Sequence, residues 1–534
     1  MSPSTQTVLV RSVRLFSVLA LLGMGLMPVH AVPLADDVSS PSLSPNLFAT
    51  CAPDGTQASG AKYRICMPAG VWNKDLIVYA HGYMAPNQPV RIPDEQLVLP
   101  DGTSITETVG FLGYAFATTS YMTNGLAIRQ GLADLVDLVS IFKAAHSDVN
   151  HVYLVGASEG GLITTLAVEQ YPHIFSGGLA TCGPVGDFNT QVSYVGDVRV
   201  LFDYFFPGLL PPSPVAIPPT LMNNWDAYFA TTILPVLSAP ASAISVTQLL
   251  SVTQAAYGPV NLNATTVITT LYSVLWYNVF ATNDAVAKLG GQPFDNHSRV
   301  YVGSLDDVHL NAGVQHFTAT TAALNEIQAH YQTTGQLRVP LVTLHTIPDQ
   351  TVPYAHETLY QAKVAAQGRT HRYVHIPVSR YGHCNFTSTE VVQALGLLQT
   401  LVLTQPPVDV DLSPGYSQAG KSGSAVVYNH IVTNTGTLSG TFVLQAASSQ
   451  NWQVALLGGA YPGGTMQLPL LLDAGMTATV QVRLTVPEGI TKTLVDYTVV
   501  TATSQISPTI FMTAVDTTRV YTQFIFLPIV FKNY

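Results

Sequence analysis

The spacing of hydrophobic positions changes along the chain and predicts two kinds of structure. Between about residues 70 and 405, short continuous apolar runs alternate with stretches whose apolar residues recur every three or four positions. Continuous runs are typical of strands buried on both faces, and spacing of three to four is typical of amphipathic helices. The alternation predicts an α/β domain, with a mostly parallel sheet covered by helices on both faces.

The elements of this domain can be placed by residue number. We expect strands at 74–83, 114–121, 152–155, 177–183, 340–346 and 373–378, and helices at 127–146, 160–170, 354–366 and 388–403. The alternation breaks at about 187–335, which is rich in Pro, Tyr, Phe, Leu and Ala and carries helical pieces at 223–237 and 321–331. We interpret this stretch as a helical lid insertion, the alternative being extra core packing.

A different pattern begins after a Pro-rich stretch at 404–415 that has the composition of a linker. Apolar residues now alternate with polar ones, as in Val480, Val482 and Leu484, which predicts strands with one buried face. Roughly six to eight such strands predict an antiparallel β-sandwich over 412–534. The α/β domain is expected at 45–404.

The N-terminus has the pattern of an export signal. Arg11 and Arg14 precede an apolar run of about 13 residues. The segment "VHA", which ends at Ala31, then has the pattern of a signal-peptide cleavage site. A membrane span needs about 20 apolar residues. We therefore predict a signal peptide at 1–31, a secreted or cell-surface-associated protein and no membrane span after removal of the signal, with a retained anchor as the alternative.

Composition and charge narrow the classes of function. The chain is 47% apolar and 10% charged, enough to bury a large core, and its net charge of -10 excludes a basic nucleic-acid interface. Four cysteines in an exported chain favour disulfides. Cys51 and Cys66 flank a short stretch near the mature N-terminus, whereas Cys182 and Cys384 are distant in sequence.

The segment "VYLVGASEGGLITTLA" holds the first candidate for chemistry. Ser158 lies between glycines at the junction of an expected strand and an expected helix. The Gly-x-Ser-x-Gly turn lifts a serine hydroxyl above the sheet edge, where it can act as a nucleophile. A purely structural turn is the alternative.

An oxyanion site should lie beside this serine. The backbone N–H of Glu159 is the expected first donor, and Tyr83 in "VYAHGYM" is the expected second, with pocket lining as its alternative role. His81 lies in the same loop. We assign it a structural role, the alternative being a catalytic base.

The acid and the base should follow in the chain order Ser, Asp, His. Asp349 follows the strand at 340–346, and His383 lies in a Gly-flanked loop before the helix at 388–403. We expect His383 to take the proton of Ser158 and Asp349 to orient and stabilise His383. Asp187 is the alternative acid.

These segments together resemble a known fold family. Residues 70–405 resemble an α/β-hydrolase through "HGY", "GASEGG", "HTIPDQTVP" and "GHCNFT", and are similar to secreted bacterial members, which implies a serine hydrolase. The segment after 412 resembles the immunoglobulin-like modules appended to many secreted bacterial hydrolases.

The "GHC" pair also resembles the tannase and feruloyl-esterase family, in which a cysteine before the serine is linked to one after the histidine. Ala157 stands before Ser158 here, so that link cannot form. We expect Cys182 to reach Cys384 instead, with two buried thiols as the alternative.

We therefore expect a secreted carboxylic-ester hydrolase that acts on small or polymeric hydrophobic or aromatic esters. The alternatives are a serine peptidase of the prolyl-oligopeptidase type, including an aminopeptidase, and a non-catalytic cell-surface binding protein. No cofactor motif and no zinc-like His/Cys spacing is present in the sequence. The sandwich is expected to contact a cell surface or a polymer.

Overall fold

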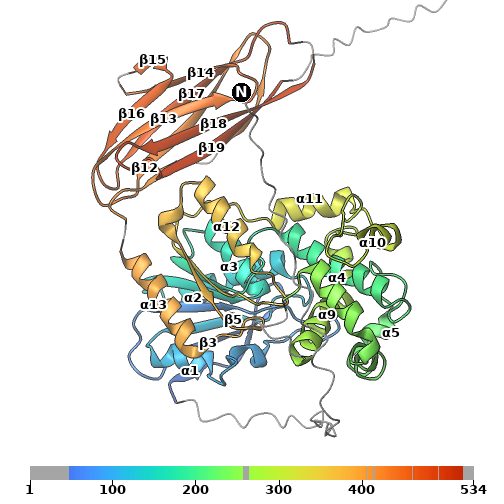
Figure 1. The fold of residues 1–534 in the computed structure, drawn as a ribbon. Helices are drawn as coiled ribbons and strands as arrows, with labels where there is room; N and C mark the ends of the chain where they lie inside the picture. Colours follow the sequence, from blue (N-terminus) through green and yellow to red (C-terminus); the bar gives the residue numbers. More distant parts are fainter. Residues whose placement is uncertain are drawn as a thin grey trace, which may run out of the picture. The chain divides into compact units, whose positions relative to one another are not determined.

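The computed structural model describes residues 47–534 except 257–263, 405, 413–414, 460, 491 and 521–534. The signal peptide expected at 1–31 lies outside the described residues. The described chain forms a sheet covered by helices, a helical insertion, and a C-terminal all-β region (Figure 1).

The central sheet has the mixed topology of the α/β-hydrolase fold. Its strand order is β1-β3-β5-β4-β6-β7-β8-β9, and β2 pairs with β3 at one side. Every pairing from β5 to β9 is parallel, whereas β1, β2 and β3 pair antiparallel. The strands are β1 Ala49–Cys51, β2 Gly55–Thr56, β3 Lys62–Pro68, β4 Asp75–Ala80, β5 Ala115–Thr119, β6 His151–Ala157, β7 Gly177–Thr181, β8 Leu341–Thr346 and β9 Tyr373–Val378.

Side chains of each central strand alternate between two separate cores. In β4, Leu76 and Val78 belong to one hydrophobic cluster and Ile77 and Tyr79 to another, and all six residues of the strand are buried. The first cluster includes residues of α2 (Ile128–Ala145), α3 (Glu159–Gln170) and α12 (Ala355–Ala366), and the second includes residues of α1 (Ile105–Phe111) and α13 (Ser388–Leu403). Burial on both faces explains why these strands are continuously apolar.

The insertion between β7 and β8 is helical and has a hydrophobic cluster of its own. Figure 1 shows α4, α5, α9 and α10 gathered in one group. Buried Arg199 of α4 donates to Asn278 of α9 at 2.8 Å and to Asp203 at 3.0 Å, so the two long helices are joined inside that cluster. The helical elements are α4 Phe188–Phe205, α5 Pro219–Met222, α6 Trp225–Tyr228, η2 Phe229–Ile233, α7 Leu234–Leu237, η3 Pro240–Ser242, α8 Ala243–Thr253, α9 Ala264–Lys288, α10 Asp307–Gly313 and α11 Thr321–His330.

Within the described ranges, no single helix is both long and apolar enough to cross a membrane. One pair of segments, Trp225–Leu237 and Pro240–Thr253, meets the length and composition test together but is bent by 76°.

The C-terminal region consists of two five-stranded sheets, in the orders β10-β12-β17-β14-β15 and β11-β19-β18-β13-β16. Residues of both sheets share one hydrophobic cluster. The strands are β10 Val410–Leu412, β11 Ser417–Gly420, β12 Ala425–Asn434, β13 Gly440–Ser448, β14 Gln453–Gly458, β15 Tyr461–Thr465, β16 Gln467–Leu472, β17 Thr477–Thr485, β18 Leu494–Ser504 and β19 Phe511–Val520.

One pairing in this region differs from the antiparallel sandwich that alternation predicts. The edge strand β11 lies parallel to β19. The chain reaches β11 by passing from β10 in the opposite sheet, so no tight hairpin imposes an antiparallel direction on it.

Candidate active site

The turn at Ser158 depends on two close backbone approaches. Ser158 follows β6, precedes α3 and has φ 57° and ψ −118°, a conformation that is strained for a residue with a side chain. A Cβ added at Gly156 would lie 2.1 Å from the carbonyl oxygen of Gly160, and one added at Gly160 would lie 2.0 Å from that of Ala80. Only glycine fits at both positions, and the hydroxyl of Ser158 is held at the end of the sheet.

The structure brings Ser158, His383 and Asp349 into one hydrogen-bonded row. Nε2 of His383 lies 2.8 Å from Oγ of Ser158, and its Nδ1 lies 2.8 Å from Oδ2 of Asp349. The other carboxylate oxygen of Asp349 accepts from the backbone N–H groups of Thr351 and Val352 at 2.8 and 2.9 Å. The carboxylate is therefore fixed by the loop that follows β8.

Two neighbouring histidines keep Asp349 ionised although it is buried. Burial alone would raise the pKa of Asp349, but attraction to His383 and hydrogen bonds from His345 and His383 hold that pKa well below its usual range. A buried, oriented carboxylate of this kind can hold one tautomer of His383 and stabilise its protonated form.

His345 and Glu357 form a second layer that the sequence did not reveal. His345 is fully buried in β8, with Nε2 3.5 Å from Asp349 and Nδ1 3.1 Å from Glu357. Burial would lower the pKa of His345, but hydrogen bonds to the two carboxylates raise it to about 10. In the sequence, the sign of this contact is the spacing: His345 lies four residues before Asp349.

The loop after β4 lies directly against the nucleophile. A Cβ added at Gly82 would be 3.2 Å from Cβ of Ser158, and the Gly82 N–H donates to the side chain of Gln96 at 2.7 Å. Tyr83 and Glu159, the expected oxyanion donors, line the same cavity as Ser158. Helix α3 begins at Glu159, so its N-terminus also favours negative charge there.

His81 and Asp187, the alternative base and acid, have other partners. His81 is buried, its Nδ1 donates to the carbonyl of Gly82 at 2.7 Å, and its ring stacks on Tyr121 with centroids 3.9 Å apart. Burial lowers its pKa to about 4. Asp187 caps α4 by accepting from the N–H of Asn189. Neither has a hydrogen bond to Ser158 or His383 among the described residues.

Two disulfides are present. Cys51 and Cys66 are direct cross-strand partners in β1 and β3, and Cys182 is bonded to Cys384 across 202 residues of chain. Cys182, His383 and Cys384 form a group of potential metal ligands, but both sulfurs are used in the disulfide. The group therefore offers no thiolate to an ion.

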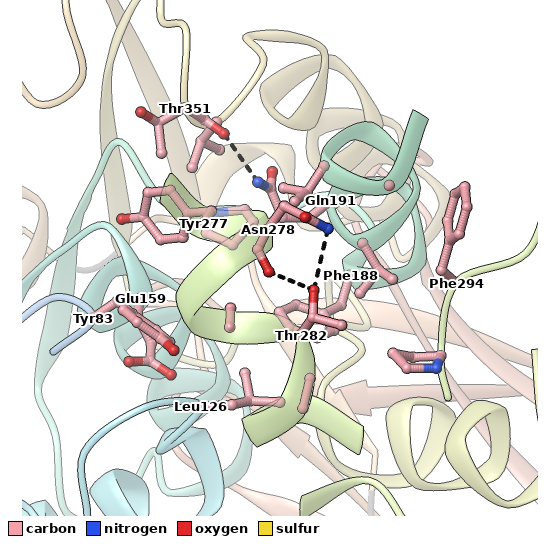
Figure 2. A pocket seen from close by; sticks show the side chains of 18 of the residues that line it. Tyr83, Leu126, Glu159, Phe188, Gln191, Tyr277, Asn278, Thr282, Phe294 and Thr351 are labelled. Atoms are coloured by element: carbon pink, nitrogen blue, oxygen red, sulfur yellow. Dashed lines mark hydrogen bonds between the residues drawn. The ribbon is translucent and has the colours of Figure 1, made fainter. Parts of the chain in front are cut away.

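An apolar cavity opens beside Ser158 (Figure 2). Helices α4 and α9 supply much of its wall, including Phe188, Val192, Ala281 and Ala285, and Gln191 of α4 donates to the carbonyl of Thr351 at 2.9 Å. The insertion is thus tied directly to the loop that carries Asp349.

Tyr277 of α9 is a second residue that the sequence did not single out. Its side chain lines the same cavity as Ser158, and its ring centroid is 5.6 Å from that of Tyr83. Burial raises the pKa of Tyr277, so the hydroxyl stays protonated. A long helix of the insertion therefore lines the cavity beside Ser158.

Comparisons with known proteins give a likeness in structure only. No family model and no curated protein matches the chain. Among solved structures, it is similar to feruloyl esterase B from Aspergillus oryzae, with 14% identity, a TM-score of 0.39 and coverage of 67% of this chain and 82% of that one. It is also similar to the Pyrococcus furiosus esterase Pf2001, with 11% identity, a TM-score of 0.33 and coverage of 66% and 91%.

A third likeness is partial. The match to the acylaminoacyl peptidase of Pyrococcus horikoshii has 10% identity and a TM-score of 0.32 and covers 63% of this chain. It spans only 37% of the length of that peptidase.

Proposed function

We propose that this protein is a serine hydrolase that cleaves carboxylic esters through an acyl-enzyme intermediate. The observation that carries the proposal is the row from Ser158 through His383 to Asp349, with both contacts at 2.8 Å, beside an apolar cavity. A nucleophile, a base within hydrogen-bond reach and an acid that orients the base are the parts that acyl transfer needs.

The chemistry follows from these positions. Oγ of Ser158 attacks the ester carbonyl carbon while His383 takes the hydroxyl proton, and the oxyanion accepts hydrogen bonds from the N–H groups of Glu159 and Tyr83. The C–O bond then breaks, and His383 returns the proton to the leaving alcohol. Water repeats the sequence on the acyl-enzyme and releases the acid. Asp349 stabilises the protonated His383 in both halves.

The cavity wall supports hydrophobic or aromatic esters as substrates. Its side chains are mostly aliphatic and aromatic, and two of its polar groups, Asn278 and Thr282, hydrogen-bond to each other. Burial of an uncharged chain against such a wall is favourable by about 25 cal/mol for each Å² removed from water. A chain end of a polymeric ester fits the same description.

A panel of substrates tests the proposal. We expect p-nitrophenyl and aryl esters to be hydrolysed faster than aminoacyl anilides, and kcat/KM of the Ser158→Ala variant to fall by at least about 10³-fold. Ser140→Ala, at an exposed serine of α2, is the matched control and should keep wild-type rates. Faster anilide cleavage would favour the peptidase, unchanged turnover in Ser158→Ala would remove Ser158 from the mechanism, and no turnover of any substrate would favour a binding protein.

Export is part of the proposal. The two disulfides support it, because such bonds persist in oxidising compartments. We expect the mature protein in the culture medium or on the cell surface to begin after Ala31, which N-terminal sequencing would show.

We also propose that residues 412–534 hold the enzyme on a surface or a polymer. A pull-down with that material would compare the full chain with one that ends at residue 404.

A further inference from the structure

The side chain of Glu159 has a buried oxygen without a partner. Oε1 accepts from the backbone N–H of Ala127 at 2.8 Å, but Oε2 is buried and has no hydrogen-bond partner among the described residues. The residue is 7% exposed and lines the same cavity as Ser158. A buried polar atom left unpaired costs roughly 1–3 kcal/mol, so this oxygen is set up to meet a group that the protein itself does not supply.

The surroundings of this carboxyl are mainly apolar. Leu126, Ile128 and Ala285 line the cavity beside it, and Figure 2 shows Glu159 next to Tyr83 and above Leu126. The charged groups that face it, Asp284 and Lys288 of α9, form an ion pair at 3.0 Å. The other titratable groups that interact with it are the hydroxyls of Tyr83, Tyr121, Tyr277 and Tyr331.

The protonation state decides what Oε2 can bind. Burial raises the pKa of Glu159 to about 8, with Asp284 adding to the increase and Lys288 and the Ala127 N–H opposing it. The carboxyl is therefore mainly protonated at neutral pH. Because Oε1 already accepts a hydrogen bond, the proton belongs on Oε2, which becomes a donor on a residue that lines the cavity.

We propose that Glu159 forms a specificity subsite in which its free Oε2 binds an ether or ketone oxygen of an otherwise apolar acyl chain. This inference rests on the proposed function, since it concerns the acyl group held on Ser158. The acyl group is the part of the ester that stays bonded to Ser158, and the cavity lined by both residues is the place for it.

Recognition of an ammonium group fits this site less well. A protonated carboxyl gives no net negative charge, and the nearby carboxylate of Asp284 is already paired with the Lys288 ammonium. A site that donates one hydrogen bond from an apolar wall selects for an acceptor at that position, because an analogue without it leaves the donor unpaired.

The experiment compares p-nitrophenyl hexanoate with analogues in which one chain methylene is replaced by an ether oxygen. The measured quantity is the ratio of kcat/KM for each ether ester to that for hexanoate. We expect a position of the oxygen at which this ratio is about tenfold higher in the wild type than in Glu159→Leu, a factor that equals about 1.4 kcal/mol. Glu159→Gln retains an N–H donor and should retain the preference.

The pH dependence separates donation from other roles. In the wild type the ratio should fall as pH rises through about 8, because the carboxylate cannot donate to an ether. In Glu159→Gln the ratio should be constant over the same range. Glu169→Gln is the matched control. Glu169 lies at the other end of α3, and its oxygens accept hydrogen bonds from Thr334, Gly335 and Tyr360. The ratio measured for this variant should therefore match that of the wild type.

Several results would overturn the proposal. An equal ratio in the wild type and Glu159→Leu would do so, as would a stronger preference for an amino-bearing ester that grows with pH. If the Leu variant does not fold, the Gln variant and the pH profile of the wild type decide. If hexanoate is hydrolysed but the ether oxygen has no effect on kcat/KM, only this subsite is refuted. If no ester is hydrolysed, both the subsite and the proposed function are refuted.

Discussion

Cys384, which follows His383 directly, is bonded to Cys182, which follows the last residue of β7. Strand β7 is the parallel neighbour of β6, the strand that ends before Ser158. The disulfide therefore ties the loop of the histidine to the part of the sheet that carries the serine, across 202 residues of sequence.

Removing this link should reduce activity as well as stability. For the variant with Cys182→Ser and Cys384→Ser, we expect a loss of about 2–4 kcal/mol in the free energy of unfolding, together with an approximately tenfold or greater fall in kcat. The fall in kcat follows because the loop with His383 loses its tether. Urea unfolding and ester turnover at a temperature where the variant stays folded would measure both.

The other disulfide provides the control. Cys51 and Cys66 link β1 to β3, on the antiparallel side of the sheet. The variant with both replaced by serine should lose stability but keep kcat while it is folded. An equal loss of kcat in the two double variants would show that the Cys182–Cys384 link has no special effect on the site.

Asp349→Asn should separate orientation from charge. An amide keeps the size of the side chain but removes the negative charge and can impose the wrong tautomer on His383. We expect kcat to fall by about 10⁴-fold, with substrate binding little changed, as steady-state kinetics on one p-nitrophenyl ester would show. Asp187→Asn is the control, and a larger fall in that variant would mean that the acid is Asp187.

The charge on His345 predicts a loss of stability in alkali. Hydrogen bonds to Asp349 and Glu357 raise the pKa of His345 from 6.5 to about 10, so its stabilising contribution is fully present below 6.5 and is lost as pH rises through 10. The free energy of unfolding should fall more between pH 7 and 10 in the wild type than in His345→Gln. Urea unfolding at several pH values measures this.

A matched histidine checks the assignment. His297 is exposed, so His297→Gln should follow the wild-type curve. Parallel curves for the wild type and His345→Gln would contradict a buried, charged His345.

Two glycines should respond in opposite directions to the same substitution. Gly160→Ala places a Cβ 2.0 Å from a backbone oxygen of β4 and should destabilise the protein by several kcal/mol or prevent folding. Gly396 lies in helix α13, and no atom lies within 4 Å of the Cβ that alanine would add. Gly396→Ala should therefore stabilise the protein by about 0.5–1 kcal/mol. Thermal unfolding of both variants decides, and equal effects would contradict the close approach at Gly160.

The main elements of the sheet could be predicted because its central strands are buried on both faces. Continuous apolar runs and helical spacing placed β4 to β9 within a few residues, and the short loops after β6 and β8, with the loop before α13, brought Ser158, Asp349 and His383 together. Residues at the carboxyl ends of parallel strands meet at one edge, so chain order alone indicated their meeting.

Other features depend on contacts that spacing does not encode. Strands β1 and β2 have only three and two residues, and just two of the seven residues of β3 are fully buried, so no clear alternation marks these strands. The contact of His345 with Glu357 joins a strand to the following helix, and the cavity shared by Tyr277 and Ser158 joins residues more than a hundred positions apart. Each arises from tertiary packing.

The cavity is built by different segments from those that hold the reacting atoms. Ser158, Asp349 and His383 stand on loops of the sheet, whereas α4 and α9 provide much of the surface that a substrate would touch. Much of the cavity wall is thus encoded in the insertion, although Tyr83 and Glu159, which also line the cavity, lie outside it. Under the proposed function, replacing the α4–α9 segment should change which esters are accepted while Ser158, Asp349 and His383 stay in place, so substrate range could change through one block of sequence.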